Sequence, residues 1–102
     1  MSTSFDDFVR EVERQSTPEE RRELDGARAR FKIGARVLQQ RLAAGLTQQQ
    51  LAAASGVAQA DISRIERGQA NPTADTLAAL AHPLGVSLDL VPIGEVTELA
   101  SV

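Results

Sequence analysis

The sequence of 102 residues contains no cysteine, tryptophan or tyrosine and only three phenylalanines. The absence of cysteine excludes disulfide bonds, thiolate zinc sites and cysteine nucleophiles. Aromatic residues make up 3% of the sequence and apolar residues 42% in total, so the core must be built from leucine, isoleucine, valine and alanine. A core of this composition suits small helices that pack closely together.

Long apolar runs and the groups that most enzymes use are also missing. No apolar run approaches the length of a membrane-spanning helix, and the acidic N-terminus has no signal-peptide hydrophobic region. We therefore expect a cytoplasmic protein with no membrane partner. The chain has no glycine-rich phosphate loop, and its single histidine, His82, has no potential metal ligands nearby in sequence. We expect one domain without enzymatic activity, cofactor or metal site.

The most informative segment is residues 45–68, which begins with the pattern of a short capped helix. Thr47 and Gln50 have the spacing of a capping box, in which each side chain accepts a hydrogen bond from the other residue's backbone. Gly56 follows where a helix end most often needs a left-handed residue. The segment therefore predicts a helix that ends in a tight glycine turn.

A second helix is expected to begin near Gln59 and to bury Ile62 and Ile65 on its inner face. Its outer face carries amides, small residues and arginines, which suits contact with base edges in a major groove. These outward residues are Gln59, Ala60, Ser63, Arg64 and Arg67. Two short helices in this order form a helix-turn-helix.

The pattern resembles the Cro/cI-like, or XRE, family of DNA-binding domains over roughly residues 33–90. Further family positions follow the second helix, namely Gly68, Asn71-Pro72-Thr73, Thr76-Leu77, Leu80-Ala81 and Leu84-Gly85-Val86. The resemblance implies an all-α fold like that of lambda repressor and sequence-specific binding of double-stranded DNA. The residues it implies for DNA binding are Thr47, Gln48, Gln59, Ala60, Ser63, Arg64, Arg67 and Asn71.

The resemblance also assigns roles to some of these residues. Gln59, Ala60 and Arg64 match positions that face base edges, and Gln48 matches a helix start that contacts phosphate. Asp61 would repel a nearby phosphate, so we interpret it as a structural residue or one that disfavours wrong sites.

Two further matches concern the domain itself rather than the DNA. Arg41 and Glu66 match a pair that forms a salt bridge within related repressors. Ala58 departs from the polar cap that usually precedes the second helix.

The net charge of −3 is distributed unevenly along the chain. Residues 1–30 carry six arginines against eight acids, and residues 72–102 carry four acids and no lysine or arginine. Residues 31–71 carry five basic residues against two acids, a charge of +3. Local charge matters more than the total for contact with a phosphate backbone. The surplus is modest, so we expect weak non-specific affinity and a need for dimerisation.

A helix is expected near the N-terminus, over residues 4–14. Ser4 and Asp7 form a capping signature, and apolar residues follow with helical spacing. These apolar residues are Phe5, Phe8, Val9 and Val12. They either bind a partner protein or pack back on the domain.

A second, longer helix is expected over residues 18–44, because Thr17 can cap it and Pro18 suits its first position. An apolar stripe runs along it at steps of three and four residues, and Gly26 and Gly34 could weaken or bend it. The stripe consists of Leu24, Ala27, Phe31, Ala35, Leu38 and Leu42.

After the motif, Thr73 can cap another helix, and Pro83 is expected to distort its last turn or end it early. Residues 87–93 then alternate with the period of a strand. A lone strand needs a partner, and the same strand of a second copy would supply one, with Leu88, Leu90 and Val91 in the dimer. The alternative is an extended tail that lies over the helices.

Residues 1–30 are thus interpreted as an N-terminal helical extension, 31–86 as the Cro/cI-like domain and 87–102 as a C-terminal β-strand and tail. The appended strand resembles HipB- and HigA-like antitoxins. The leading hypothesis is a repressor that binds an inverted-repeat operator as a homodimer and also neutralises a small basic toxin. The alternatives are a stand-alone regulator and a protein-interaction module without DNA binding.

Overall fold

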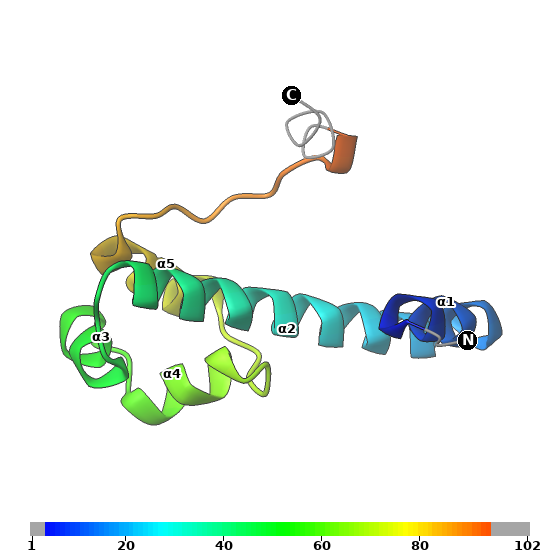
Figure 1. The fold of residues 1–102 in the computed structure, drawn as a ribbon, viewed down its shortest axis with the longest axis horizontal. Helices are drawn as coiled ribbons and strands as arrows, with labels where there is room; N and C mark the ends of the chain where they lie inside the picture. Colours follow the sequence, from blue (N-terminus) through cyan, green and yellow to red (C-terminus); the bar gives the residue numbers. More distant parts are fainter. Residues whose placement is uncertain (1–3, 95–102) are drawn as a thin grey trace.

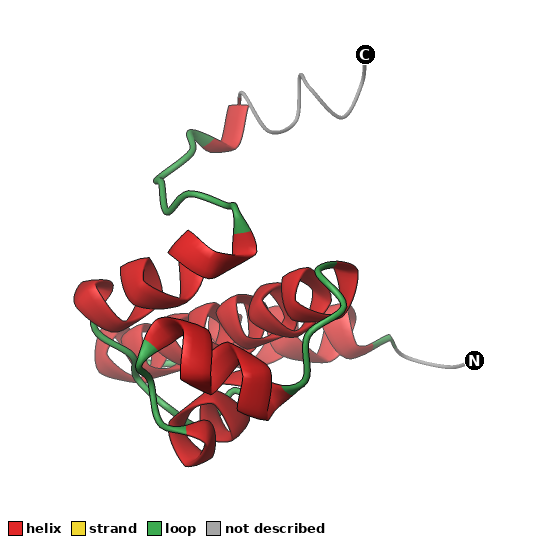
Figure 2. Ribbon diagram, turned by 90° about the vertical axis from the view of Figure 1, so that its left-hand side faces the viewer, coloured by secondary structure: helices red, strands yellow, loops and turns green. Residues whose placement is uncertain are grey.

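The computed structural model describes residues 4–94, and five helices of eight or more residues form in that range (Figure 1). They are α1 (Phe5–Gln15), α2 (Pro18–Ala43), α3 (Gln48–Ser55), α4 (Gln59–Glu66) and α5 (Ala74–Leu84). α2 is the long axis of the molecule, with α3 and α4 along one side of its C-terminal half (Figure 1). The described part is coloured as helix and loop alone (Figure 2), which agrees with the predicted all-α fold. None of these helices combines the length and the apolar character needed to cross a membrane.

Serine and threonine caps determine where four of the five helices begin. Ser4, Thr17, Thr47 and Thr73 each accept a hydrogen bond from the backbone amide three residues on, at 3.0–3.1 Å. These hydrogen bonds satisfy amides that have no partner within the helix. The predicted helix starts are confirmed, and so is the missing side-chain cap at Ala58, before α4.

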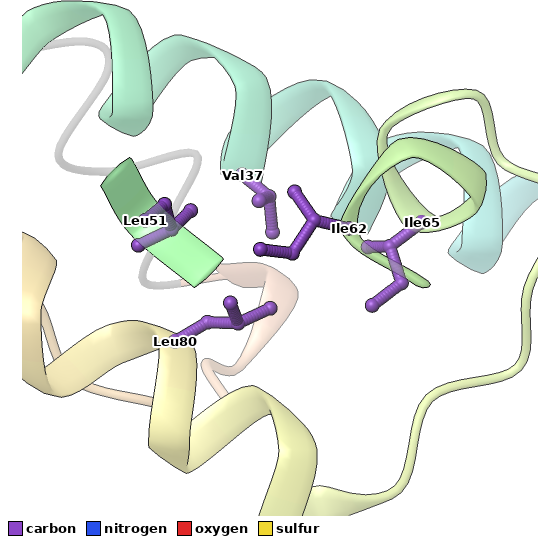
Figure 3. Close-up of a cluster of buried hydrophobic side chains, with 5 residues drawn as sticks. All are labelled: Val37, Leu51, Ile62, Ile65 and Leu80. Atoms are coloured by element: carbon purple, nitrogen blue, oxygen red, sulfur yellow. The ribbon is translucent and has the colours of Figure 1, made fainter. Parts of the chain in front are cut away.

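The core is a small aliphatic cluster at the centre of the last four helices (Figure 3). α2, α3 and α5 contribute Val37, Leu51 and Leu80, and α4 contributes both Ile62 and Ile65. Each of these side chains is at most 9% exposed. Because α4 supplies two of the five, the helix that carries the predicted DNA contacts is anchored at the centre of the core.

α2 and α4 approach so closely that only glycine fits at the crossing. A β-carbon on Gly34 would lie 2.2 Å from the carbonyl oxygen of Ile65 and 3.1 Å from that of Glu66. Real side chains do not make contacts as short as the first, so any larger residue would push the two helices apart. Gly34 is therefore a packing residue, whereas its helical position alone indicated only a weak point in α2.

The apolar stripe of α2 is not the face that packs into the core. Phe31 and Leu42 are 71% and 61% exposed, whereas Gly34 and Val37 are buried. Periodicity predicted the helix, but the close approach of α4 selects the face with the smaller residue.

Arg41 and Glu66 join α2 to the end of α4, as the resemblance implied. The Arg41 Nε donates to Glu66 Oε2 at 2.7 Å, and Nη2 donates to Oε1 at 2.9 Å. The remaining guanidinium nitrogen donates to the carbonyl oxygen of Leu46 at 2.9 Å. The two charged side chains are only 11% and 4% exposed. A nearly buried bidentate pair of this kind is stable only while both partners are present.

α1 folds back along the N-terminal half of α2 (Figure 1). The Arg21 Nε donates to the carbonyl oxygen of Glu13 at 2.9 Å, and the Glu13 carboxylate pairs with Arg28. Val9, predicted to lie on a partner-binding face with Phe5 and Phe8, is only 4% exposed and packs within the chain. Phe5 and Phe8 behave differently, because they remain on the surface.

Pro83 does not end α5 early. The helix continues through Pro83 to Leu84 and ends at Gly85, which has a left-handed φ of +70°. A proline this close to the helix end removes a single backbone hydrogen bond. Of the two alternatives expected for Pro83, a distorted last turn or an early end, the early end is therefore wrong.

The β-strand predicted over residues 87–93 does not form within the described chain. Residues 86–92 are irregular, and residues 93 and 94 are helical. A strand is defined by its pairing with another strand, and the other described residues form helices and loops. Its apolar residues are exposed, with Leu88 at 55%, Leu90 at 94% and Val91 at 52%. The rest of the predicted tail, residues 95–102, lies outside the described residues.

Replacing Gly34 with alanine should lower the free energy of unfolding by about 1–3 kcal/mol, because the added methyl group overpacks the α2–α4 crossing. Gly26→Ala is the matched control in the same helix, since its β-carbon would meet only the flexible end of Arg30, at 3.2 Å. That change should be neutral or stabilise the protein by about 0.5–1 kcal/mol. Urea unfolding measures the stability of both variants. Equal stability of Gly34→Ala and Gly26→Ala would contradict the close packing at Gly34.

Removing one member of the Arg41–Glu66 pair should destabilise the protein by about 3–5 kcal/mol, because the other charge would remain buried without a partner. Arg41→Met and Glu66→Leu together should recover much of this loss. A double-mutant cycle tests this: chemical denaturation gives the free energy of unfolding of the wild type, the two single variants and the double variant. Additive losses in the double variant would mean that the two side chains do not interact.

Candidate nucleic-acid interface

The outer face of α4 is exposed because its inner face is held by the core. Ile62 and Ile65 are 0% and 3% exposed, and helical spacing turns the residues between them outward. Gln59, Ala60 and Arg64 are exposed, as predicted for residues that face base edges. The turn before α4 depends on Gly56, whose φ of +79° is in the left-handed region.

The other predicted DNA contacts surround this helix. Ser63 is half-buried, and Arg67, at the end of α4, is exposed and donates its Nε to the Ser63 carbonyl oxygen at 3.2 Å. Asn71 is exposed in the loop that follows. Thr47 is exposed, but its hydroxyl already accepts the Gln50 amide at the start of α3. Their side chains therefore differ in how free they are to meet DNA.

Gln48 has a structural contact that its sequence position did not reveal. Its Nε2 donates to Glu66 Oε1 at 3.0 Å, which joins the first residue of α3 to the last residue of α4. Gln48 and Gln59 also line one surface depression of about 480 Å³, together with Thr47 and Arg41. The starts of both helices of the motif thus meet at one surface.

Glu66 stays ionised in this network. Burial by itself would raise the pKa of its carboxyl group, but hydrogen bonds from Arg41 and Gln48 and the nearby guanidinium charge outweigh burial and lower the pKa below its usual value. The same hydrogen bond raises the pKa of Arg41 despite burial. Because the pKa of Glu66 is lowered on folding, its contribution to stability is present above the ordinary glutamate pKa and is lost as the pH falls below it.

Arg64 is paired within α4 itself. Its Nη2 contacts Asp61 Oδ1, and both side chains remain about half exposed, at 57% and 47%. The spacing of three residues on one helix is a sequence signal that could have predicted this pair. Asp61, interpreted from the sequence as a structural residue or one that disfavours wrong sites, is thus an immediate neighbour of the arginine predicted to read a base.

The positive charge of residues 31–71 resides on a few side chains. Arg41 and Arg64 are neutralised by Glu66 and Asp61. Within residues 4–94, the basic side chains of this segment with no acidic group within 4 Å are Lys32, Arg36 and Arg67. Arg67 ends α4, whereas Lys32 and Arg36 are each two residues from Gly34 and therefore lie on the side of α2 away from α4. The surface around α4 therefore offers amide and guanidinium donors with little net positive charge, a chemistry suited to base edges and to a few phosphates.

Comparison with known proteins concerns the same segment of the chain. The helix-turn-helix family matches residues 37–91. An uncharacterised HTH-type transcriptional regulator from Haemophilus influenzae is 51% identical over 49 residues, which cover 48% of this chain and 50% of that protein. Another, y4dJ from Sinorhizobium fredii, is 46% identical over 55 residues, which cover 54% of this chain and 71% of that protein. No solved structure matches the chain significantly.

The matched segment includes all of α3, α4 and α5, together with the end of α2 that carries Arg41. The aligned part of the chain spans only half the length of the Haemophilus protein, so the likeness concerns the domain. The chain belongs to the helix-turn-helix family, in its Cro/cI-like (XRE) form.

Proposed function

We propose that this protein is a sequence-specific DNA-binding transcription regulator. The single observation that carries the proposal is the outer surface of α4, where Gln59, Ala60 and Arg64 are exposed while Ile62 and Ile65 of the same helix are buried in the core. Membership of the helix-turn-helix family supports it, and so do the printed names of the two relatives. In this proposal α4 enters the major groove and serves as the recognition helix.

Base reading falls to two side chains of α4. A guanidinium such as that of Arg64 can donate two hydrogen bonds to guanine, and an amide such as that of Gln59 can bind adenine in the same way. Gln48, Arg67 and Asn71 lie around the ends of α3 and α4, where they would meet the phosphate backbone and set the register. Among the described residues, three basic side chains of residues 31–71 have no acidic group within 4 Å, and two of them face away from α4, so the phosphate contribution of one chain is small.

A homodimer would make up for this weak backbone contact. We propose that residues 87–93 pair with the same residues of a second copy, because their pattern has the period of a strand and Leu88, Leu90 and Val91 expose their apolar side chains. A two-fold axis would place two recognition helices on one face. The operator would then be an inverted repeat with half-sites about one helical turn, ~10 bp, or a multiple of it apart.

Selection from a pool of randomised DNA duplexes tests these assignments together. The wild-type chain should recover an inverted repeat, and Arg64→Ala should weaken binding to it by about 1–3 kcal/mol and flatten the preference at one base pair of each half-site. Arg36→Ala is the matched control, because it removes the same charge from an exposed position of α2. Gly34 faces α4, and a step of two residues leads to the opposite side of a helix, so Arg36 faces away from α4.

Two outcomes would contradict the proposal in different ways. If Arg64→Ala weakened binding to selected and random duplexes equally, Arg64 would contact phosphate and not a base. Recovery of a single half-site without its inverted copy would argue against the dimer.

A second function, binding a partner protein through α1, is favoured by one observation. Phe5 and Phe8 are 76% and 60% exposed, so they do not pack back on the domain. Exposed phenylalanines on one helix can anchor a protein interface. In the antitoxin form of this proposal, the partner is the small basic toxin of a toxin–antitoxin pair.

The charge of α1 gives this second function less support than its apolar side chains do. Asp7, Glu11 and Glu13 are each paired with an arginine of the chain. Within the described residues, Asp6 is the acid of α1 with no basic group within 4 Å. We therefore assign binding energy to the phenylalanines and only a minor part to attraction of a basic partner.

Phe5→Ala combined with Phe8→Ala should abolish capture of the product of the neighbouring reading frame, because both anchors would be lost, and should leave DNA binding unchanged. Phe31→Ala, which removes a similarly exposed phenylalanine from α2, is the control and should leave capture intact. The readouts are co-purification of the two proteins and a DNA mobility shift. Undiminished capture by the double variant, or loss of its helical content, would remove the partner-binding role of α1. A chain that binds DNA but captures no neighbour would be a stand-alone regulator.

A further inference from the structure

The outer half of α4 contains a carboxylate beside the arginine proposed to read a base. α4 has two acids, and they face in different directions. Glu66 is 4% exposed and bound to Arg41, whereas Asp61 is 47% exposed and contacts the Nη2 of Arg64. Because Arg64 is itself 57% exposed, the pair lies on the surface that would meet DNA.

A carboxylate at this place is unfavourable for simple attraction to DNA. It neutralises one of the five basic residues of residues 31–71, and it would repel any phosphate that approaches the start of α4. Its contribution to folding is modest, because an exposed pair at this spacing contributes only about 0.3–0.5 kcal/mol and an acid in the first turn of a helix adds about 0.3–1 kcal/mol. General affinity for DNA does not account for Asp61 at this position, and the helix-start contribution does not depend on its contact with Arg64.

Arginine has enough hydrogen-bond donors for Arg64 to bind Asp61 and a base at the same time. A guanidinium has five N–H donors, and bidentate reading of guanine uses two of them. The hydrogen bond from Nη2 to Asp61 can use a third, so Arg64 need not leave Asp61 in order to bind a base. A guanidinium held on one side loses less rotamer freedom when it binds, and its carboxylate neighbour disfavours a phosphate in place of the base.

We propose that Asp61 is a specificity-determining residue, which positions Arg64 for a base edge and disfavours its contact with phosphate. This inference rests on the proposed function of α4 as a DNA-reading helix. Asp61 acts through Arg64, so it is a positioning residue. Its removal should make the protein bind more DNA sequences, and bind random DNA more tightly.

The test compares two duplexes, the sequence that the wild-type chain selects from a randomised pool and a shuffled duplex of the same composition. Asp61→Ala should raise affinity for the shuffled duplex and lower the ratio of selected to shuffled affinity by at least about fivefold, the lower bound for one base-edge contact. Asp75→Ala is the matched control, since it removes an exposed acid from the first turn of α5 and should leave the ratio unchanged.

A thermodynamic cycle with Arg64 separates positioning from other effects of the charge. In a chain that already carries Arg64→Ala, the further change Asp61→Ala should no longer alter the ratio. Circular dichroism checks that each variant is folded. If Asp61→Ala lost helical content, Asp61→Asn, which keeps the side-chain shape, would take its place in the same cycle.

The outcomes that overturn the inference differ from those that overturn the proposed function. An unchanged ratio in Asp61→Ala would mean that Asp61 acts only as a charge. A ratio that still falls in the Arg64→Ala background would mean that Asp61 reads a base on its own. In both cases the wild type still selects a sequence. Failure of the wild type to select any sequence would instead contradict the proposed function.

Discussion

The close contact between α2 and α4 is the constraint on which the rest of the structure depends. α4 has eight residues and no side-chain cap, and a helix this short is not stable alone. It is held by burial of Ile62 and Ile65 and by the direct approach of its last residues to Gly34. Since one side of α4 is committed to this contact, the opposite side must face solvent. The orientation of the proposed DNA surface thus follows from the packing.

The Arg41–Glu66–Gln48 network adds direction to this contact. It connects the end of α4 to α2 through a bidentate pair and to the start of α3 through an amide. Hydrogen bonds between charged groups allow a smaller range of distances and angles than apolar contacts do. The network therefore restricts rotation of α4 relative to α3 more than the apolar core alone would. For a helix that must place side chains against particular base edges, that limit has a functional value beyond stability.

Local signals in the sequence predicted much of the fold. The threonine caps, the left-handed Gly56 and the inward isoleucines of α4 are short-range features, and each is confirmed. Arg41 and Glu66 are 25 residues apart, and only the resemblance to a known family indicated their pairing.

Features that depend on how helices meet could not be predicted in the same way. The stripe through Phe31 and Leu42 has helical spacing but is exposed, because the crossing at Gly34 decides which face of α2 is buried. Val9 shares its apolar character with Phe5 and Phe8, and only the packing of α1 against α2 separates them. Of the missed site contacts, the bond from Gln48 to Glu66 requires the tertiary structure, whereas the Asp61–Arg64 pair was available from spacing alone.

The central claim is that α4 and its immediate neighbours form the DNA-binding surface. The most direct measurement is a nuclear magnetic resonance titration of the ¹⁵N-labelled chain with a selected duplex, following the backbone amides and the side-chain amides of Gln48 and Gln59. The account predicts that the largest shift changes fall within residues 47–71, including both side-chain amides, while the amides of α1 change little. Large changes in α1 with the amides of α4 unaffected would contradict it.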